Sequence, residues 1–170
     1  MTYQAATPPS PDAVGEYVAV NADRGNMLVR RWAGCWIDLL FLAVLVILVF
    51  VLAAAILPRE EGAGIALLLA ALVVLGYFPL TEGLWGRSLG KFVTGTIVIQ
   101  RDGSRASFGQ VVGRTILRLV EVNPLLAGGI PAGIALLCTK GKQRLGDLAA
   151  GTYVVPVKAL QAARAQESVF

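Results

Sequence analysis

One uninterrupted apolar run limits what this chain can fold into. Nineteen consecutive residues, from Leu39 to Leu57, are apolar. At about 1.5 Å of rise per residue, a helix of this length spans the roughly 30 Å hydrocarbon core of a bilayer. We expect the helix to begin earlier, near Arg31, so that Asp38 lies in its first turns. The chain is therefore predicted to be an integral membrane protein.

The composition agrees with lipid as the main solvent. Hydrophobic residues make up 56% of the 170 residues and charged residues 15%, whereas a soluble domain carries about 25% charged residues. There is no histidine, which excludes histidine-ligated metal sites and histidine-based catalytic triads. Cys35 and Cys138 lie apart in apolar stretches and are interpreted as small core or lipid-facing residues. The sequence shows no serine nucleophile with a base and no paired carboxylates of a soluble cleft, so we do not expect an enzyme. We also expect no cofactor and no metal.

A second apolar run, residues 62–80, follows a short polar loop and has Pro79 and Glu82 near its end. We predict two spans, at about 32–57 and 62–82, that together form a helical hairpin.

A second, shorter hairpin is expected at about 109–138. Its first half reads as a helix that Asn123-Pro124 ends, and its second half is apolar, short and rich in glycine and proline. The sequence leaves open whether this hairpin crosses the membrane as two tilted spans or enters it as a re-entrant pair. The predicted fold class is all-α integral membrane: a small helical bundle of two hairpins.

The remaining segments should lie outside the bilayer. Residues rich in β-branched side chains at 96–100, 152–156 and more weakly 17–20 predict a small cytoplasmic β-sheet. The first sixteen residues hold three prolines and little that could build a core, which is typical of disorder. The predicted organisation is a disordered tail over 1–16, a transmembrane domain over 17–156 and a cytoplasmic tail, helical or frayed, over 157–170.

The basic residues predict the orientation. Three precede the first span, six lie between Arg87 and Arg118, five follow residue 139, and Arg59 alone lies in the first hairpin loop. Lysine and arginine are enriched on the cytoplasmic side of membrane proteins. An even number of crossings places fourteen of the fifteen basic residues on that side, with both termini cytoplasmic. Membrane orientation thus explains the basic balance better than nucleic-acid binding does.

An internal repeat suggests two related halves. LGKFVTGTIVI, 89–99, aligns without gaps with LGDLAAGTYVV, 145–155, and each copy follows a predicted hairpin. A seven-residue spacing also recurs, in the pair Arg31 and Asp38 and in the pair Arg114 and Glu121. We infer a tandem pseudo-repeat, with halves related by a pseudo-two-fold axis along the membrane normal.

Three blocks of the sequence resemble a known family. They are RRWAGCWID (30–38), GRSLGKFVTGTIVIQRDG (86–103) and QRLGDLAAGTYVV (143–155). All three are similar to blocks of the RDD family of bacterial membrane proteins, named for one arginine and two aspartates, and the resemblance covers roughly residues 28–156. The matching residues are Arg31, Asp38 and Asp147, while Ser88 stands where threonine is usual.

The resemblance implies a multi-pass protein of the bacterial inner membrane with a suggested role in transport, including cation/proton exchange. Such a small transporter or exchange component would bind a monovalent cation or a proton. The alternative is a membrane scaffold or accessory subunit of a larger complex. Because a bundle of 170 residues is thin for enclosing a pathway, we expect a homo-oligomer or a partner membrane subunit.

Asp38 raises the main physical question. A carboxylate costs about 2.5–3.5 kcal/mol at mid-membrane and less near an interface, so it must be paired, protonated or hydrated. Arg31 lies about 10.5 Å away along the helix axis, which is too far for an easy bond. We therefore expect Asp38 to pair with Arg114 or Arg118 from the second half.

The other charges complete a predicted network at the cytoplasmic end of the bundle. Asp147 is expected to cap the short helix after it or to accept from an arginine, and Glu121 to face Arg30 or Arg31. Lys91 should meet lipid phosphates or the loop of Asp147. The predicted set is Arg31, Asp38, Asp147, Arg114, Arg118 and Glu121, with Lys91 and Glu82 as secondary members.

Three interpretations of this network stay open. It could lock the helices to the cytoplasmic sheet as a structural network. It could hold a cation or a proton, because buried carboxylates without a full set of partners suit such a site. Its basic rim could also contact membrane lipid headgroups or a protein partner.

Overall fold

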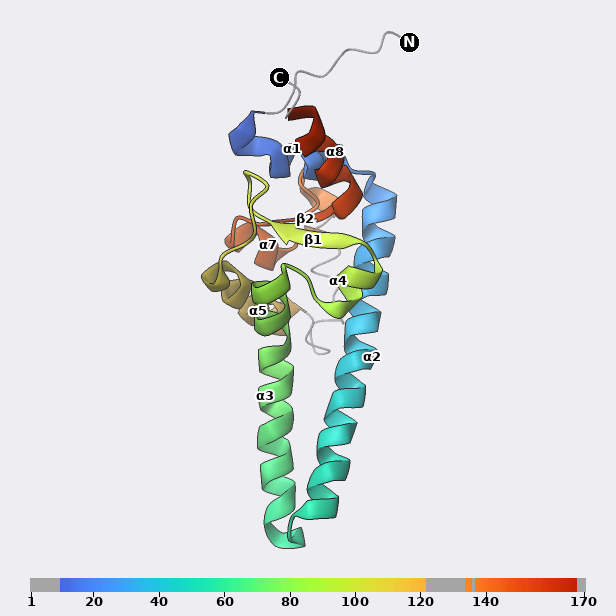
Figure 1. Ribbon diagram of the computed structural model, residues 1–170, viewed down its shortest axis with the longest axis vertical. Helices are drawn as coiled ribbons and strands as arrows, with labels where there is room; N and C mark the ends of the chain where they lie inside the picture. The colour runs from blue at the N-terminus through green and yellow to red at the C-terminus, as the bar shows by residue number, and fades with distance from the viewer. Residues whose placement is uncertain (1–9, 122–133, 136, 168–170) are drawn as a thin grey trace.

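A long helical hairpin dominates the fold in the computed structural model, which describes residues 10–121, 134, 135 and 137–167. Its two legs are α2, Arg24–Ile56, and α3, Arg59–Trp85 (Figure 1). Both helices are long and apolar enough to cross a bilayer, and only 11% and 17% of their most apolar 18-residue windows is buried. A core helix of a soluble protein would be mostly buried, so these two helices are candidate membrane spans, and they form a helical hairpin as predicted.

Local sequence signals set the ends of the hairpin. The Asp23 carboxylate accepts a hydrogen bond of 2.6 Å from the Asn26 backbone N–H, which caps the start of α2. Pro58 lies at the turn between the legs, and Gly86, at a φ of 71°, ends α3 in the left-handed conformation. The first helix thus begins at Arg24, before the predicted residue 32, because it has a cap there.

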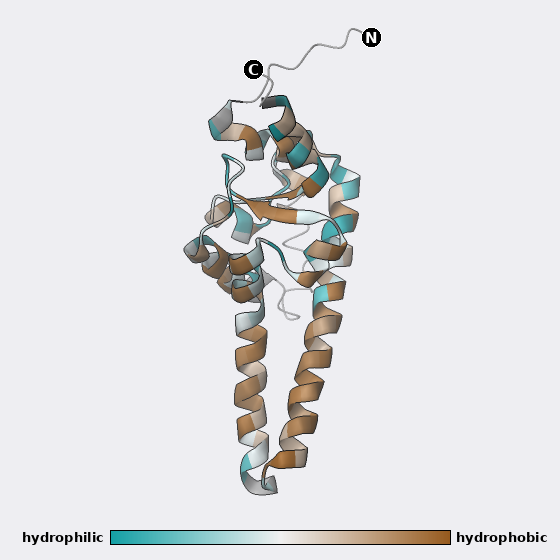
Figure 2. Cartoon of the chain, viewed as in Figure 1, coloured by the Kyte–Doolittle hydropathy of each residue, from teal (hydrophilic) through white to brown (hydrophobic). Residues whose placement is uncertain are grey.

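All the other described elements gather at the end of the hairpin where α2 begins and α3 ends (Figure 1). We call this part the head. Its elements are a 3-10 helix over Pro11–Ala13, α1 (Val14–Asn21), α4 (Leu89–Val93), β1 (Thr96–Ile99), α5 (Phe108–Glu121), α7 (Leu145–Ala149), β2 (Tyr153–Pro156) and α8 (Val157–Glu167). Figure 2 shows apolar residues along both legs and most of the polar residues in the head.

The two strands pair in antiparallel register, with Ile97 opposite Val155 and Val98 opposite Val154. Successive side chains of a strand point to opposite faces. On one face, Ile99 and Val155 pack with side chains of α1 and α8. On the other face, Val98 and Val154 pack with residues near the start of α2 and in α5. The sheet therefore separates a small outer layer, α1 and α8, from the hairpin.

The structure corrects two expectations at the N-terminus. Residues 17–20 are not a third strand but belong to α1, where Val14 and Val18, one helical turn apart, are buried against the sheet. Residues 11–16, expected within a disordered tail, form a 3-10 helix and the first turn of α1. At the other end, the tail over 157–170 is helical as α8 up to Glu167, with Leu160 buried.

The second hairpin can be judged only in part. Its first helix is present as α5, which packs against α3 and α7. Most of the rest, residues 122–133 and 136, lies outside the described residues. Whether 109–138 crosses the membrane stays a prediction.

Candidate functional site

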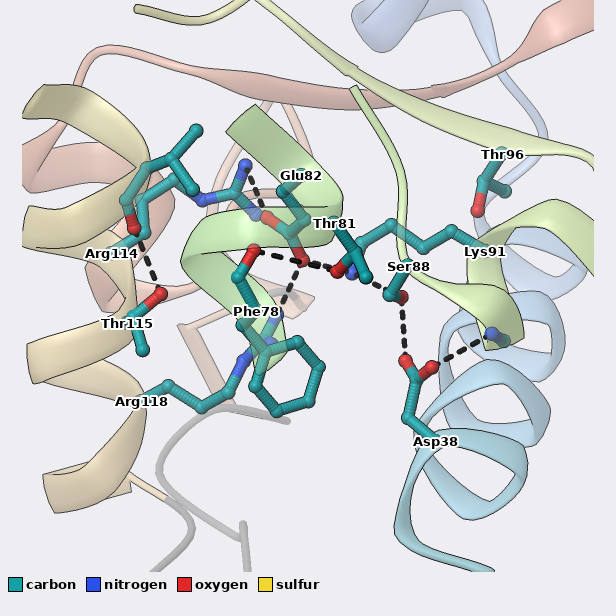
Figure 3. Close-up of polar contacts among 12 residues, drawn as sticks. Asp38, Phe78, Thr81, Glu82, Ser88, Lys91, Thr96, Arg114, Thr115 and Arg118 are labelled. Carbon is teal, nitrogen blue, oxygen red and sulfur yellow. Dashed lines mark hydrogen bonds and ion pairs between the residues drawn. The ribbon is translucent and has the colours of Figure 1, made fainter. Parts of the chain in front are cut away.

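Asp38 lies on α2 with only 3% of its surface exposed, and neutral groups hold its carboxylate. It accepts hydrogen bonds from the Ser88 hydroxyl at 2.6 Å, the Tyr77 hydroxyl at 2.8 Å and the Gly90 backbone N–H at 2.7 Å. Figure 3 shows Asp38 turned toward α4 and away from the arginines of α5.

The predicted pairing of Asp38 with Arg114 or Arg118 is wrong. Within the described ranges, no lysine or arginine nitrogen lies within 4.0 Å of its carboxylate. The reason is which elements lie next to Asp38. The α3 helix and the start of α4 bring three neutral donors to its carboxylate, whereas the arginines of α5 pair with Glu82 and Asp147. The sequence offered no pattern that named Tyr77 or Gly90 as donors.

Two glycines let α4 come close enough to α2 for this contact. A Cβ atom added to Gly90 would clash with the Gly34 carbonyl oxygen of α2, and one added to Gly34 would lie 3.3 Å from the Gly90 oxygen. The Tyr77 hydroxyl also accepts from the Leu89 N–H at 3.1 Å, which fixes the start of α4. The sequence did carry a signal, because glycine occupies this position in both copies of the repeat, at 90 and 146.

Glu82, near the end of α3, takes the cations that were expected at Asp38. It is 2% exposed, and its carboxylate lies 2.7 Å from Lys91 Nζ and 3.3 Å from Arg118 Nη2. Arg114 Nη1 is 3.7 Å away (Figure 3). Lys91 thus pairs with Glu82, and not with the loop of Asp147, because α4 lies directly beside the last turns of α3.

Asp147 forms the second ionic centre. Its carboxylate pairs with Arg31 and lies 2.7 Å from Arg114 Nη2. It also accepts from the Arg144 backbone N–H at 3.1 Å, so it caps the helix that contains it, α7, and not a helix after it. Arg31 in addition donates to the Lys142 carbonyl. The predicted partner of Arg31, the side chain of Glu121, lies outside what the structure describes.

Burial and charge act in opposite directions on these groups. Burial alone would raise the pKa of the Asp147 carboxyl, but the guanidinium groups of Arg114 and Arg31 outweigh it and hold that pKa well below its usual range. Burial lowers the pKa of the Lys91 ammonium to about 8, although Glu82 opposes the shift. Both residues therefore stay mostly ionised at neutral pH.

A cavity of about 380 Å³ lies between these groups. It is bounded by α2, α3, α4, α5, α7 and the face of the sheet that carries Val154. The basic residues that line it, among those described, are Arg30, Arg31, Lys91, Arg114, Arg118 and Arg144, and the acidic ones are Asp38 and Asp147. The site thus combines an excess of positive charge with one carboxylate, Asp38, that is held by neutral donors.

Comparisons with known proteins identify the family. Curated proteins and solved structures gave no match to the chain. The sequence model of the RDD family matches residues 25–151, which is well over half of the chain. The matched range includes nearly all of α2, all of α3, the short helices α4 and α7 that precede the two strands, and the residues Arg31, Asp38 and Asp147. On this match, the chain belongs to the RDD family.

Proposed function

We propose that this membrane protein is a proton-coupled transport component, with Asp38 as the group that takes up and releases the proton. The observation that carries the proposal is a contrast between buried carboxylates: Asp147 in the cavity lining and Glu82 behind it are each compensated by arginine or lysine, and Asp38 is held by two hydroxyls and a backbone N–H. Hydroxyl groups both donate and accept, so Ser88 and Tyr77 can follow a change in the protonation of Asp38. Buried carboxylates of this kind are functional candidates in membrane proteins.

The charge around the cavity favours a proton over a monovalent cation. A metal cation at Asp38 would lie in a cavity whose described lining includes six basic side chains, and like charges repel strongly at low dielectric. A proton on the carboxylate adds no separate cation that must be accommodated. Of the two ions in the expected cation/proton exchange, we therefore assign only the proton to Asp38.

The orientation of the protein follows from the same charges. The head carries the basic residues, and Arg59, at the opposite end of the hairpin, is the exception. By the positive-inside rule we propose that the head and both termini are cytoplasmic, and that the protein sits in a bacterial inner membrane.

The two candidate spans among the described residues are too few to enclose a pathway, so we propose that a second half and further copies or a partner subunit complete it. The local geometry of the repeat supports two related halves. Ser88 and Arg144, which precede α4 and α7, have nearly equal φ and ψ, −77° and 171° against −80° and 169°. Gly95 and Gly151, which precede the strands, have φ values of 67° and 62°.

Proton flux into proteoliposomes tests the proposal. We expect a pH-sensitive dye inside the vesicles to report flux for the wild type under an imposed pH gradient, and no flux for Asp38→Asn. The matched control is Asp102→Asn, an exposed aspartate of the turn after β1, which should leave flux unchanged. Wild-type flux equal to that of empty liposomes would end the transport proposal, and full flux in folded Asp38→Asn would remove Asp38 from it.

A scaffold is the second candidate, favoured by one observation. The ion pairs of Asp147 and Glu82 join α2, α3, α4, α5 and α7 into one locked network. A scaffold predicts an absence of flux together with a stoichiometric partner recovered by crosslinking in native membranes. Recovery of no such partner would count against it.

A further inference from the structure

We propose that the cavity binds a phosphate group, carried by a lipid headgroup or by a soluble phosphate compound, through the guanidinium groups of Arg114 and Arg118. This inference rests on the proposed function only for the location of the site. It requires neither flux nor a titrating Asp38.

The first argument is that these two arginines have hydrogen-bond donors to spare. Arg114 Nε and Nη1 and Arg118 Nη1 are buried and have no hydrogen-bond partner among the residues that the structure describes. Arg114 is 5% exposed, and its Nη1 lies 3.7 Å from Glu82, within ion-pair range but beyond a hydrogen bond. A buried donor without a partner is costly, so an acceptor in the adjoining cavity would stabilise the head.

The second argument is the balance of charge. The six basic residues of the described lining face Asp38 and Asp147, and Glu82 adds a third carboxylate behind Lys91 and Arg118. If all are ionised, positive charge is in excess around one cavity whose lining is buried or partly buried, and uncompensated charge in such a place is costly. An anion in the cavity removes this cost.

The third argument is that the arginines are held in place before a ligand arrives. The guanidinium group of Arg118 stacks on the Phe78 ring at 3.9 Å and is tethered at one nitrogen to Glu82. Arg114 is tethered by its Nη2 to Asp147. Figure 3 shows both side chains converging on Glu82 from α5. Stacking covers a face of the Arg118 guanidinium and Glu82 takes Nη2, which leaves Nη1 at the edge as a charged donor for a phosphate oxygen.

The shape of the cavity adds the class of ligand. Its volume of about 380 Å³ lies at the lower end of the usual range for small-molecule sites, about 300–1,000 Å³. On the side of the hairpin its lining is apolar, with Leu39, Leu42, Val74 and Phe78. A phosphate group at the arginines and an apolar part along the legs would fill it, as a phospholipid does, and free phosphate would fill only the basic end.

A binding experiment on the full-length protein in detergent tests the soluble source. The melting temperature is measured in increasing inorganic phosphate and in chloride at equal ionic strength and pH 7. We expect phosphate to raise the melting temperature of the wild type, and Arg118→Gln to weaken phosphate binding about ten-fold or more, since a charged hydrogen bond is lost. The matched control is Arg101→Gln, whose side chain is 69% exposed in the turn after β1 and which should behave as the wild type.

Native mass spectrometry of the same samples tests the lipid source. Phosphatidylglycerol or a neutral galactolipid without phosphate is added to the detergent-solubilised protein. A lipid site predicts that the wild type and Arg101→Gln retain phosphatidylglycerol in preference to the galactolipid, and that Arg118→Gln loses this preference. A soluble ligand predicts a phosphate-dependent melting temperature without lipid retention.

The proposal is overturned if the wild type shows neither response, or if folded Arg118→Gln responds to the same degree as the wild type. Should Arg118→Gln fail to fold, Arg118→Lys keeps the charge beside Glu82 and removes the planar donor edge; it should then bind phosphate several-fold more weakly than the wild type. No proton gradient is involved, so a failure of binding and a failure of flux are separate results.

Discussion

Asp38 and Asp147 are buried aspartates that line the same cavity, but the structure holds them in different ways. Asp38 accepts from two hydroxyls and a backbone N–H. Asp147 pairs with two guanidinium groups, which only donate. The difference arises because α4 presents a glycine N–H and Ser88 to α2, whereas α7 places its own aspartate between α2 and α5. The comparison assigns to Asp147 the role of holding the elements of the head together, and it is the basis on which Asp38 is proposed as the proton carrier.

The largest effect is expected for Asp147→Asn. The neutral amide would no longer compensate the buried positive charges of Arg31 and Arg114, and its NH₂ group would face their N–H donors. We therefore expect a loss of about 3–5 kcal/mol in the free energy of unfolding. Chemical denaturation in detergent measures it, with Asp102→Asn as an exposed control. A loss below about 1 kcal/mol would remove the claim that Asp147 fixes the head.

A smaller loss is expected for Gly90→Ala, because the new methyl group meets the Gly34 carbonyl. We expect a cost of about 1–3 kcal/mol, as in overpacked cores, and a weakened hydrogen bond from residue 90 to Asp38. Gly64→Ala, where a Cβ atom would meet nothing within 4 Å, is the control and should not lower stability. Equal stabilities for the two variants would show that the close approach of α4 to α2 is not needed.

Asp38→Asn should cost only about 1 kcal/mol. The asparagine oxygen, in the place of Oδ1, still accepts from the Gly90 N–H and the Tyr77 hydroxyl, and the Ser88 hydroxyl, which faces the other oxygen of Asp38, can rotate to accept from the new NH₂ group. Denaturation alongside Asp147→Asn checks the order of the two losses. If Asp38→Asn is the more destabilising variant, then Asp38, and not Asp147, is the aspartate that contributes more to holding the head together.

The contribution of Asp147 to the free energy of unfolding should depend on pH only in the acid range. The folded-state pKa of Asp147 lies below its usual value, so its contribution to stability is fully present above the unfolded-state pKa of about 3.9 and is lost as pH falls through the folded-state pKa. We expect its part of the unfolding free energy to be constant between pH 7 and 5 and to fall below about pH 4. In Asp147→Asn this decline should be weaker; an unchanged acid profile would contradict the assignment.

These contrasts also show what the sequence could and could not predict. The apolar runs predicted α2 and α3, because the need to span lipid fixes both length and composition. The β-branched runs predicted both strands, and the repeat contains glycine at 90 and 146, although no close contact was predicted from it. The sequence could not predict the partner of Asp38, since Tyr77 and a backbone N–H carry no charge pattern. Residues 17–20 alone also could not predict α1. The helical spacing of its buried residues, Val14 and Val18, becomes visible only when Val14 is included.

A double-mutant cycle between Asp38 and Arg118 tests the central claim most directly. The variants are Asp38→Asn, Arg118→Gln and the double variant, and the free energy of unfolding is measured for each. If Asp38 and Arg118 do not pair directly, they are linked only through Ser88, Lys91 and Glu82, so the two losses should add to within about 1 kcal/mol, while the same cycle between Glu82 and Arg118 shows clear coupling. A coupling above about 1.5 kcal/mol between Asp38 and Arg118 would mean that they form an ion pair after all, and the account of two differently held aspartates would be wrong.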